Sequence, residues 1–520
     1  MSAHQVILLL THVSESSSQP SAESERIAEL ERQLKWANLK IQLLEERLRL
    51  ERIKKYGPAS EKLSDAQLDL LDGEPGVSGA EVQAESEREP LPQPAKKAQP
   101  PRKHPGRQEL PANLPRVERV IACAPEQCTC KACGKATSVI GYEVSEQLDV
   151  EPAKYFVLVT RREKRACPAC GGAGVAEAPA PARIVDKSLA SDRVVINTLV
   201  AKYSDHLPLY RQSAILERET GVEISRATMD GWVMRTGELL IPMVAVTSRE
   251  LVGGTYIQAD ETPVDVQMHD GRGRNHQAYL WQYGRPGGAV VFDFRLGRGR
   301  EGPKQFLGKF AGILQTDGYI AYEGVGGPGM VHAACWAHSR RKFHEALKLH
   351  SEDLAALRVV VAMDDLFAID AAARERNLDH AARHALRCEQ APPLLDIIKQ
   401  RVEAAQAGAL PASALGRAAS YTLTLWPKLT RFLDHPELEL SNNLAENSMR
   451  PVALGRKNWI HLGSQEAGPK VAAIISIIET CRRLRIPARE YLAAVLPGLA
   501  DVPVHRLPEL TPMAWASTSR

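Results

Sequence analysis

Two aspartates lie in the most strand-like parts of this chain. Asp260 belongs to residues 255–266, where apolar and polar residues alternate as in a half-buried strand, and we expect it at the strand's end, just before Pro263. Asp317 ends a similar run within residues 312–322. A carboxylate on a rigid strand suits a hard divalent cation such as Mg²⁺, which prefers oxygen ligands. A lone aspartate of this kind is more often a turn former, so this interpretation needs further residues.

A third carboxylate, Glu446, follows in a segment with helical spacing. Ser441 can cap this helix, and spacings of three and four place Asn443, Glu446 and Arg450 on one face. That face would offer a metal ligand flanked by phosphate-binding groups. Carboxylates that approach closely repel one another unless a cation lies between them, so convergence of the three acids would indicate a metal site.

Cysteines provide a second set of candidate metal ligands. Two C-x-x-C pairs, separated by 33 residues, consist of Cys130, Cys133, Cys167 and Cys170. Each pair precedes glycine or small residues, as the turns of a tetrahedral Zn²⁺ site require. The sequence therefore predicts a zinc ribbon with one structural Zn²⁺, with redox dithiols as the alternative and Cys128 as a substitute ligand.

His332, Cys335 and His338 are also spaced like metal ligands. A strand that runs into a helix would separate these side chains, so a structural or DNA-facing role is favoured over a second zinc site.

Positioning the acids requires a sheet. Strand-like segments are expected at residues 255–266, 277–283 and 289–294, a short helix at 303–310, and further strands at 312–322 and 330–336. This order resembles a ribonuclease-H-like domain, whose fourth strand lies beside its first and would bring Asp260 and Asp317 together. The expected fold class is α+β and multidomain, with that catalytic domain at residues 251–350 and 434–470 and a helical insertion at 351–433.

The remaining segments suggest further domains. We expect a disordered N-terminus (1–20), a coiled coil (21–56), a linker with a basic segment (57–116), the zinc ribbon (117–182), a helical region resembling a helix-turn-helix (183–250), and C-terminal helices and tail (471–520). The heptad spacing favours self-association over a monomeric amphipathic helix. The basic segment could contact phosphates or be a solvated tether.

The helical region contains a hairpin pattern. One helix would end at Gly221 and the next would be capped by Ser225, which would present Arg226 and Thr228 to a DNA groove. Such hairpins also serve as plain packing modules, and the sequence leaves both readings open.

Basic and acidic residues almost balance, at 66 and 63, and the net charge is +3. Any DNA-binding surface must therefore be local. The N-terminal apolar run is short and lacks a preceding cation, and the longest apolar run, residues 471–478, is too short to cross a bilayer and is expected to pack on the sheet. We expect a cytoplasmic protein without membrane contact.

Four sequence motifs occur in this order along the chain: ADETPVDVQ, LQTDGYIAYE, CWAHSRRKF and NNLAENSMRPVALGRKNW. Together with the paired C-x-x-C ribbon, they closely resemble the insertion-sequence-66 family of DDE transposases over nearly the whole chain. The resemblance implies that Asp260, Asp317 and Glu446 form a catalytic acidic triad. Asn447 stands where many relatives carry Arg, a departure that leaves the triad intact.

The resemblance also implies a mechanism and partners. Two Mg²⁺ (or Mn²⁺) ions would activate a water or a DNA 3′-hydroxyl and stabilise the leaving oxygen, first freeing the element's 3′ ends and then joining them to target DNA. Expected partners are double-stranded DNA, namely the terminal repeats and the target, further copies of the chain, and accessory proteins of the same element.

Several residues are candidates for DNA contacts. Phosphates would be bound by Arg340, Arg341, Arg450, Arg456 and Lys457, and Trp459 would stack or wedge. For each, a surface ion pair or a core position is an equally good interpretation. At the level of the whole chain, the alternatives are a catalytically silent DNA-binding protein and a nuclease of the same fold.

Overall fold

A computed structural model describes residues 155–166, 175–268, 270–271 and 273–518, together with residues 26, 30, 34, 135 and 136. The four zinc-ribbon cysteines, the linker and most of the coiled-coil segment lie outside the described residues, so those predictions remain predictions. The chain divides into two compact units, residues 1–88 with 162–520, and residues 89–161. Only the first unit is described below.

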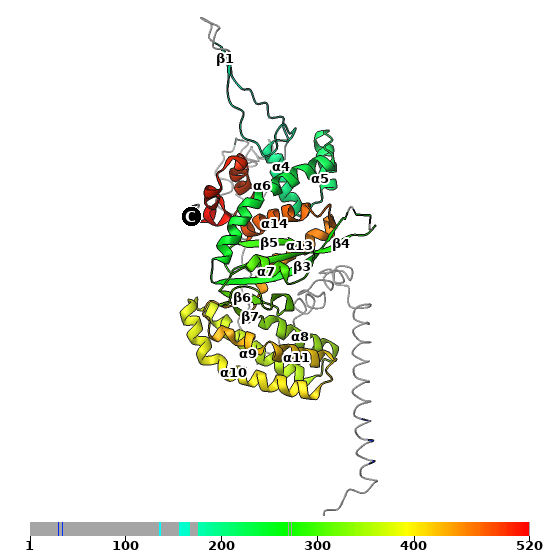
Figure 1. The fold of residues 1–520 in the computed structure, drawn as a ribbon, viewed down its shortest axis with the longest axis vertical. Helices are drawn as coiled ribbons and strands as arrows, with labels where there is room; N and C mark the ends of the chain where they lie inside the picture. The colour runs from blue at the N-terminus through cyan, green and yellow to red at the C-terminus, as the bar shows by residue number, and fades with distance from the viewer. Residues whose placement is uncertain are drawn as a thin grey trace, which may run out of the picture. The chain divides into compact units, whose positions relative to one another are not determined.

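A mixed six-stranded sheet carries the acids (Figure 1). Its strands are β3 (Tyr256–Val266), β4 (His276–Gly284), β5 (Val290–Arg295), β6 (Ile313–Thr316), β7 (Val331–Ala334) and β8 (His461–Leu462). The order is β5-β4-β3-β6-β7, with β8 pairing the end of β3; β3, β4 and β5 are antiparallel, whereas β6, β7 and β8 run parallel to their neighbours. The helix α7 (Glu301–Leu307) connects β5 to β6. The expected adjacency of the first and fourth strands is confirmed.

The strand β3 differs from its expectation in two ways. It runs on through Pro263 to Val266, so Asp260 lies in its middle, and only Asp265 is exposed, so both faces are buried. Pro263 is tolerated because the edge of β3 away from β4 has a gap there: β6 pairs only with Tyr256 to Gln258, and β8 only from Asp265.

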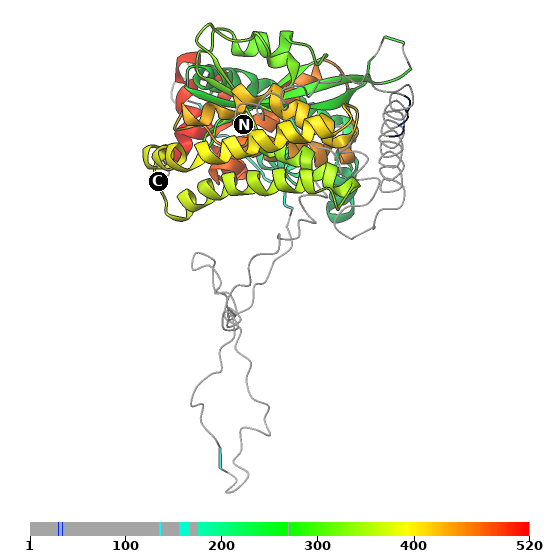
Figure 2. The same cartoon turned by 90° about the horizontal axis from the view of Figure 1, so that it is seen from below.

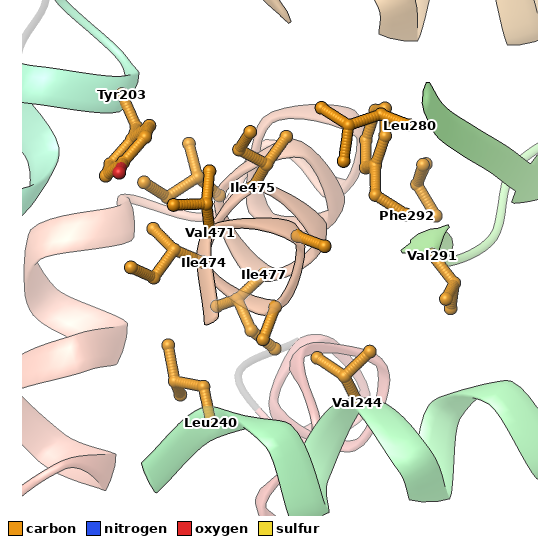
Figure 3. Packing of buried hydrophobic residues seen from close by; sticks show 14 of the residues in the cluster. Tyr203, Leu240, Val244, Leu280, Val291, Phe292, Val471, Ile474, Ile475 and Ile477 are labelled. Carbon is orange, nitrogen blue, oxygen red and sulfur yellow. The ribbon is translucent and has the colours of Figure 1, made fainter. Parts of the chain in front are cut away.

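The helix α14 (Ala467–Leu484) covers one face of the sheet and also closes its edge. Its Ser476 hydroxyl accepts from the Phe292 amide at 2.8 Å, and Thr480 Oγ1 accepts from the Val290 amide at 3.0 Å. These bonds satisfy backbone groups of β5 that no further strand pairs. Figure 3 shows apolar side chains of α14 between β4 and β5, α6 and Tyr203. The expected packing of residues 471–478 on the sheet is confirmed.

A helical hairpin precedes the sheet. It follows α4 (Asp192–Tyr203) and consists of α5 (Leu209–Thr220) and α6 (Arg226–Val252). Gly221 ends α5 in the left-handed region, at φ 70°, and the Ser225 hydroxyl caps α6 by accepting from the Thr228 amide at 3.1 Å. The predicted hairpin is therefore confirmed, and α6 continues from it into the core against α14.

A separate group of helices interrupts the chain between β7 and β8 (Figures 1 and 2). It follows α8 (Trp336–Leu349) and consists of α9 (Leu354–Glu375), α10 (His380–Gly408), α11 (Ala414–Thr424), α12 (Trp426–Leu429) and the 3₁₀ turn η4 (Thr430–Leu433). The apolar core of these helices includes Met363, Ile398 and Phe432 and is continuous with side chains of the sheet, among them Ile313 and Ala333. We call α9 to η4 the helical insertion. After it, α13 (Asn443–Trp459) returns to the sheet.

The other described elements are small. A hairpin pairs β1 (Lys164–Ala166) with β2 (Val175–Glu177), η3 (Ile320–Tyr322) follows β6, and α15 (Ala488–Val495), η5 (Leu499–Asp501), η6 (Val504–Leu510) and α16 (Pro512–Thr518) end the chain. Within the described residues, the helices are too short or too polar to cross a membrane.

Candidate acidic site

Three different elements deliver the three predicted acids. Asp260 lies in the middle of β3, Asp317 directly follows β6, and Glu446 lies in the first turn of α13. The first two come together because β3 and β6 are paired neighbours. The negative charges of both Asp317 and Glu446 act on Asp260. Acids separated by up to 186 positions in the chain therefore share one cluster.

Asp260 carries the strongest electrostatic signal in this cluster. It is 3% exposed. Burial raises the pKa of Asp260 well above its usual range, and the charges of Glu261, Asp317 and Glu446 raise it further, with only His338 acting in the opposite direction. A buried group of carboxylates with too little positive charge fits a hard cation with oxygen ligands. At the start of α13, the buried Asn442 side chain also lacks hydrogen-bond partners among the described residues, and a bound water or ligand would supply them.

Glu446 is held by two cationic side chains from α8. Arg341 Nη2 lies 3.0 Å from Glu446 Oε2, and His338 Nδ1 lies 3.4 Å from Oε1. Burial alone would lower the pKa of His338, but Glu446 and Cys335 raise it to about 10. The raised pKa favours the protonated form of His338, whose positive charge adds to that of Arg341 beside Glu446.

The start of α13 corrects one expectation. Asn442, not Ser441, is the N-cap residue, and its side chain makes no capping bond. The Ser441 carbonyl instead accepts from Gln258 Nε2 at 3.0 Å, so this residue belongs to the extended segment that leads into the helix. Glu446 is buried whereas Asn443 and Arg450 are exposed, so Glu446 lies at the buried border of their shared face.

Glu261 is a fourth buried carboxylate that sequence reasoning missed. Arg298 contacts its Oε1 from Nη2 at 2.9 Å, and the Tyr322 hydroxyl donates to Oε2 at 2.8 Å. Burial and then the charge of Asp317 raise the pKa of Glu261 to about 7, although Arg298 lowers it. The DET triplet could have revealed this acid, but its Arg298 partner comes from a loop without a recognisable pattern.

The predicted separation of His332, Cys335 and His338 is correct in part. His332 lies apart, with Nε2 3.2 Å from Thr316 Oγ1. Cys335 and His338 stay together, and Glu446 joins them with ligand atoms within 4.8 Å of one another. The thiol, imidazole and carboxylate of this buried cluster are also the kinds of ligand that a metal ion takes, so an ion pair and a metal site both fit it.

The predicted phosphate-binding residues divide into two groups. Arg340 is paired with Asp364 at 2.5 Å, and Arg341 with Glu446. Arg456 donates to the Pro263 carbonyl and so fills the gap in the pairing of β3, while burial lowers its pKa to about 10. These three guanidinium groups have partners inside the protein.

The other candidates lie nearer the surface. Arg226, Thr228 and Arg450 are exposed, and Lys457 is half-buried. Trp459 packs against the main core, with Lys202 Nζ 6.0 Å from the centre of its ring. Packing against the core is thus one role of this half-buried side chain, and its predicted contact with DNA stays a prediction.

Comparison with known proteins identifies the class of protein. The model described as "Transposase IS66 family" matches residues 187–470, which include the whole acidic cluster. A model for the zinc-finger binding domain of transposase IS66 matches residues 127–171, and one described as "Transposase C of IS166 homeodomain" matches residues 43–119. The chain belongs to the IS66 transposase family. Its partner is accordingly DNA, and the zinc-finger match, which spans all four ribbon cysteines, supports a structural zinc ion.

Relatives in Sinorhizobium fredii (strain NBRC 101917 / NGR234) are similar over most of their length. The uncharacterized protein y4qI is 32% identical over 502 residues, covering 92% of this chain and 90% of the relative. The uncharacterized protein y4hP is 31% identical, covering 80% and 78%.

Proposed function

We propose that this chain is a DDE transposase with a ribonuclease-H-like catalytic domain. It would bind the ends of its element, cleave DNA to free the 3′ ends and join them to target DNA. The observation that carries the proposal is the convergence of Asp260, Asp317 and Glu446 in one acidic cluster, in which Asp260 and Glu446 are buried and Asp317 is half-buried. A protein that only binds DNA has no use for such a cluster, which repels phosphates.

The sheet supports the fold proposal. Three antiparallel strands followed by a strand parallel to the first, with the order β5-β4-β3-β6-β7, is the arrangement expected of a ribonuclease-H-like domain. The third acid then comes from a helix, α13, that packs against β3.

The acids are oriented by the chain itself. Asp260 Oδ1 accepts from the Glu261 amide at 2.9 Å, Asp317 Oδ1 from the Tyr319 amide at 2.8 Å, and Glu446 Oε2 from Arg341 at 3.0 Å. One oxygen of each acid is therefore anchored, which fixes the carboxylate before any ligand binds. Two Mg²⁺ or Mn²⁺ ions held by these acids would supply activation of the attacking hydroxyl and stabilisation of the leaving oxygen.

Other regions would supply DNA binding and assembly. Arg226 and Thr228 on the hairpin, with Arg450 and Lys457 on α13, are the proposed DNA contacts. Cys130, Cys133, Cys167 and Cys170 would hold the zinc ion, and the N-terminal heptads would join copies of the chain. Arg340, Arg341 and Arg456 are better explained by their internal partners.

The direct test incubates the purified protein with labelled element ends and Mg²⁺. Asp317→Ala is expected to reduce end cleavage and strand joining at least a hundredfold, because a ligand of the proposed ions is lost. Asp265→Ala is the matched control, since Asp265 is an exposed carboxylate on β3, and it should keep full activity.

Unchanged joining by Asp317→Ala would refute the assigned mechanism. Cleavage without joining by the wild type would indicate a nuclease, and binding without either reaction a silent DNA-binding protein.

A further inference from the structure

The helical insertion contacts the backbone of one acid directly. Tyr421, on α11, donates its hydroxyl to the main-chain carbonyl of Asp317. Next to this bond, Leu425 packs against Gly318 so closely that a Cβ on Gly318 would lie 2.5 Å from Leu425 Cδ1. Gly318 has φ +94°, so the turn that follows Asp317 is shaped to accept the insertion.

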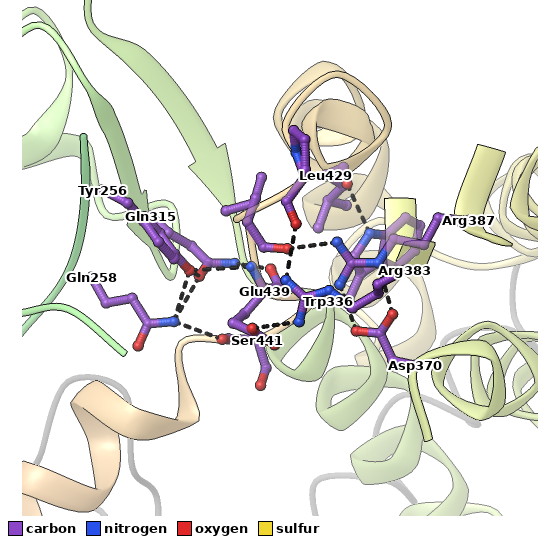
Figure 4. A network of polar contacts seen from close by, with 12 residues as sticks. Tyr256, Gln258, Gln315, Trp336, Asp370, Arg383, Arg387, Leu429, Glu439 and Ser441 are labelled. Carbon is purple, nitrogen blue, oxygen red and sulfur yellow. Dashed lines mark hydrogen bonds and ion pairs between the residues drawn. The ribbon is translucent and has the colours of Figure 1, made fainter. Parts of the chain in front are cut away.

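The same insertion holds the segment that leads to another acid (Figure 4). On α10, Arg383 contacts Glu439 Oε1 at 2.7 Å and donates to the Pro436 carbonyl at 2.9 Å. Arg387 donates to the Leu438 carbonyl at 2.7 Å. Both guanidinium groups thus fix residues 436–439, which run towards α13 and Glu446.

Side chains of the sheet donate hydrogen bonds to the same segment before α13. Gln315 Nε2, on β6, donates to the Glu439 carbonyl at 2.7 Å, and Gln258 Nε2, on β3, donates to the Ser441 carbonyl at 3.0 Å. Between them, the Trp336 amide donates to the Leu440 carbonyl at 2.9 Å. Every carbonyl from Leu438 to Ser441 is therefore bonded, so the register in which the chain enters α13 is set.

Burying the charged side chains of Arg383 and Arg387 costs free energy, which is hard to explain if their only role is to stabilise the fold. Arg387 is 1% exposed and forms a two-pronged pair with buried Asp370, at 2.7 and 2.6 Å. Buried ion pairs contribute little net stability compared with apolar packing, but they impose geometry. That geometry is applied to backbone carbonyls outside the insertion.

We propose that the helical insertion is a brace for the acidic site. Tyr421, Arg383 and Arg387 are its positioning residues: Tyr421 fixes Asp317, and the two arginines fix the segment that sets Glu446. The brace holds these acids at the separation that a divalent cation requires. This inference therefore depends on the metal site of the proposed function.

The test measures Ca²⁺ binding to the full-length, zinc-loaded protein by isothermal titration calorimetry without DNA. Tyr421→Phe and Arg383→Met should each raise the Ca²⁺ dissociation constant about threefold to tenfold, the effect of losing one well-made hydrogen bond or ion pair. In the double variant the two effects should multiply, because each acts on a different acid. The same variants should need more Mg²⁺ for half-maximal cleavage while their KM for DNA stays unchanged.

Matched controls separate positioning from folding. Tyr279→Phe removes a surface hydroxyl bond, and Arg401→Met removes an arginine-to-carbonyl bond within the insertion. Both should bind Ca²⁺ like the wild type. Melting temperatures without Ca²⁺ identify any variant that is merely unfolded, and Tyr421→Phe changes only one hydroxyl.

The outcomes distinguish the brace from the metal site. Wild-type Ca²⁺ binding that is lost in Asp317→Asn but unchanged in Tyr421→Phe and Arg383→Met would overturn the brace alone. Binding that Asp317→Asn leaves intact would overturn the proposed metal site and the brace with it.

Discussion

At the scale of single residues, charge balance distinguishes the acids. Glu446 has Arg341 and His338 beside it, whereas Asp260 has three acidic neighbours and only His338 to oppose them. Arg298 likewise compensates Glu261, so the imbalance of charge is greatest at Asp260. Cation binding would supply the missing compensation at Asp260.

His332 gives a pH-dependent prediction at this scale. Burial and nearby Lys428 lower its pKa to about 4, against the charge of Glu323. Between that value and about 6.5, the unfolded chain takes up a proton that the folded protein does not, so stability is full above this window and falls as the pH falls through it. At pH 5 the loss should be about 2 kcal/mol. His332→Gln should remove it, so that the melting temperature falls less between pH 7.5 and pH 5.

Exposed His380 provides the control for this measurement, because His380→Gln should leave the acid-induced drop unchanged. An equal drop in His332→Gln and wild type would show that another group titrates.

The acids could be predicted from sequence, but their partners could not. Asp260 and Asp317 lie in strand-like runs whose order implies adjacency. Arg341, in contrast, lies 105 positions before Glu446 and belongs to a basic run that reads equally well as a phosphate-binding surface. Its role depends on where α8 packs against α13, which local spacing does not encode.

At the scale of elements, α14 acts as a substitute for a missing strand. The Thr480 hydroxyl both accepts from the Val290 amide, at 3.0 Å, and donates to the Val290 carbonyl, at 3.1 Å. It therefore makes both bonds that a neighbouring strand would make at this position.

Thr480→Val should lower the melting temperature measurably, since it keeps the shape of the side chain but leaves two buried backbone groups unpaired, at a cost of about 1–3 kcal/mol. Thermal unfolding followed by circular dichroism provides the measurement. Thr236→Val is the matched control: Thr236 is also buried, but its hydroxyl bonds to Trp232 in its own helix, where the carbonyl has a helical partner. Equal effects of the two substitutions would contradict the edge-closing role.

Two expectations from the sequence were wrong at the scale of elements: the exposed face of β3 and the capping role of Ser441. Both errors have a physical cause. Alternation in residues 255–266 predicts one exposed face, but the polar face of β3 is covered because Gln258 bonds to Gln315 and to the Ser441 carbonyl. Ser441 is a good capping residue by type, yet that bond engages it one residue before the cap. Both errors involve contacts with the segment before α13, which lies more than 170 positions from Gln258 in the chain and which local spacing does not encode.

At the scale of the whole molecule, metal content is the clearest prediction. Cys130→Ser should lose about one equivalent of zinc, measured by elemental analysis, because a four-thiolate site does not survive the loss of a ligand. Cys335→Ser is the control, since Cys335 lies outside residues 127–171 that the zinc-finger model matches, and it should keep the zinc. Loss of zinc from the Cys335 variant alone would indicate that the zinc ion binds at the acidic site and not at the ribbon.

The helix α6 spans 27 residues, from Arg226 in the hairpin to Val252, with Pro242 inside it, and β3 begins at Tyr256. Each residue of an α-helix adds a rotation of about 100° around the helix axis and a rise of about 1.5 Å along it. One residue added to α6 would therefore swing the hairpin about a quarter of a turn around the axis that leads to the Asp260 strand. If Arg226 and Thr228 contact DNA as proposed, only changes of α6 by nearly whole turns would keep these residues and the acids directed at the same duplex.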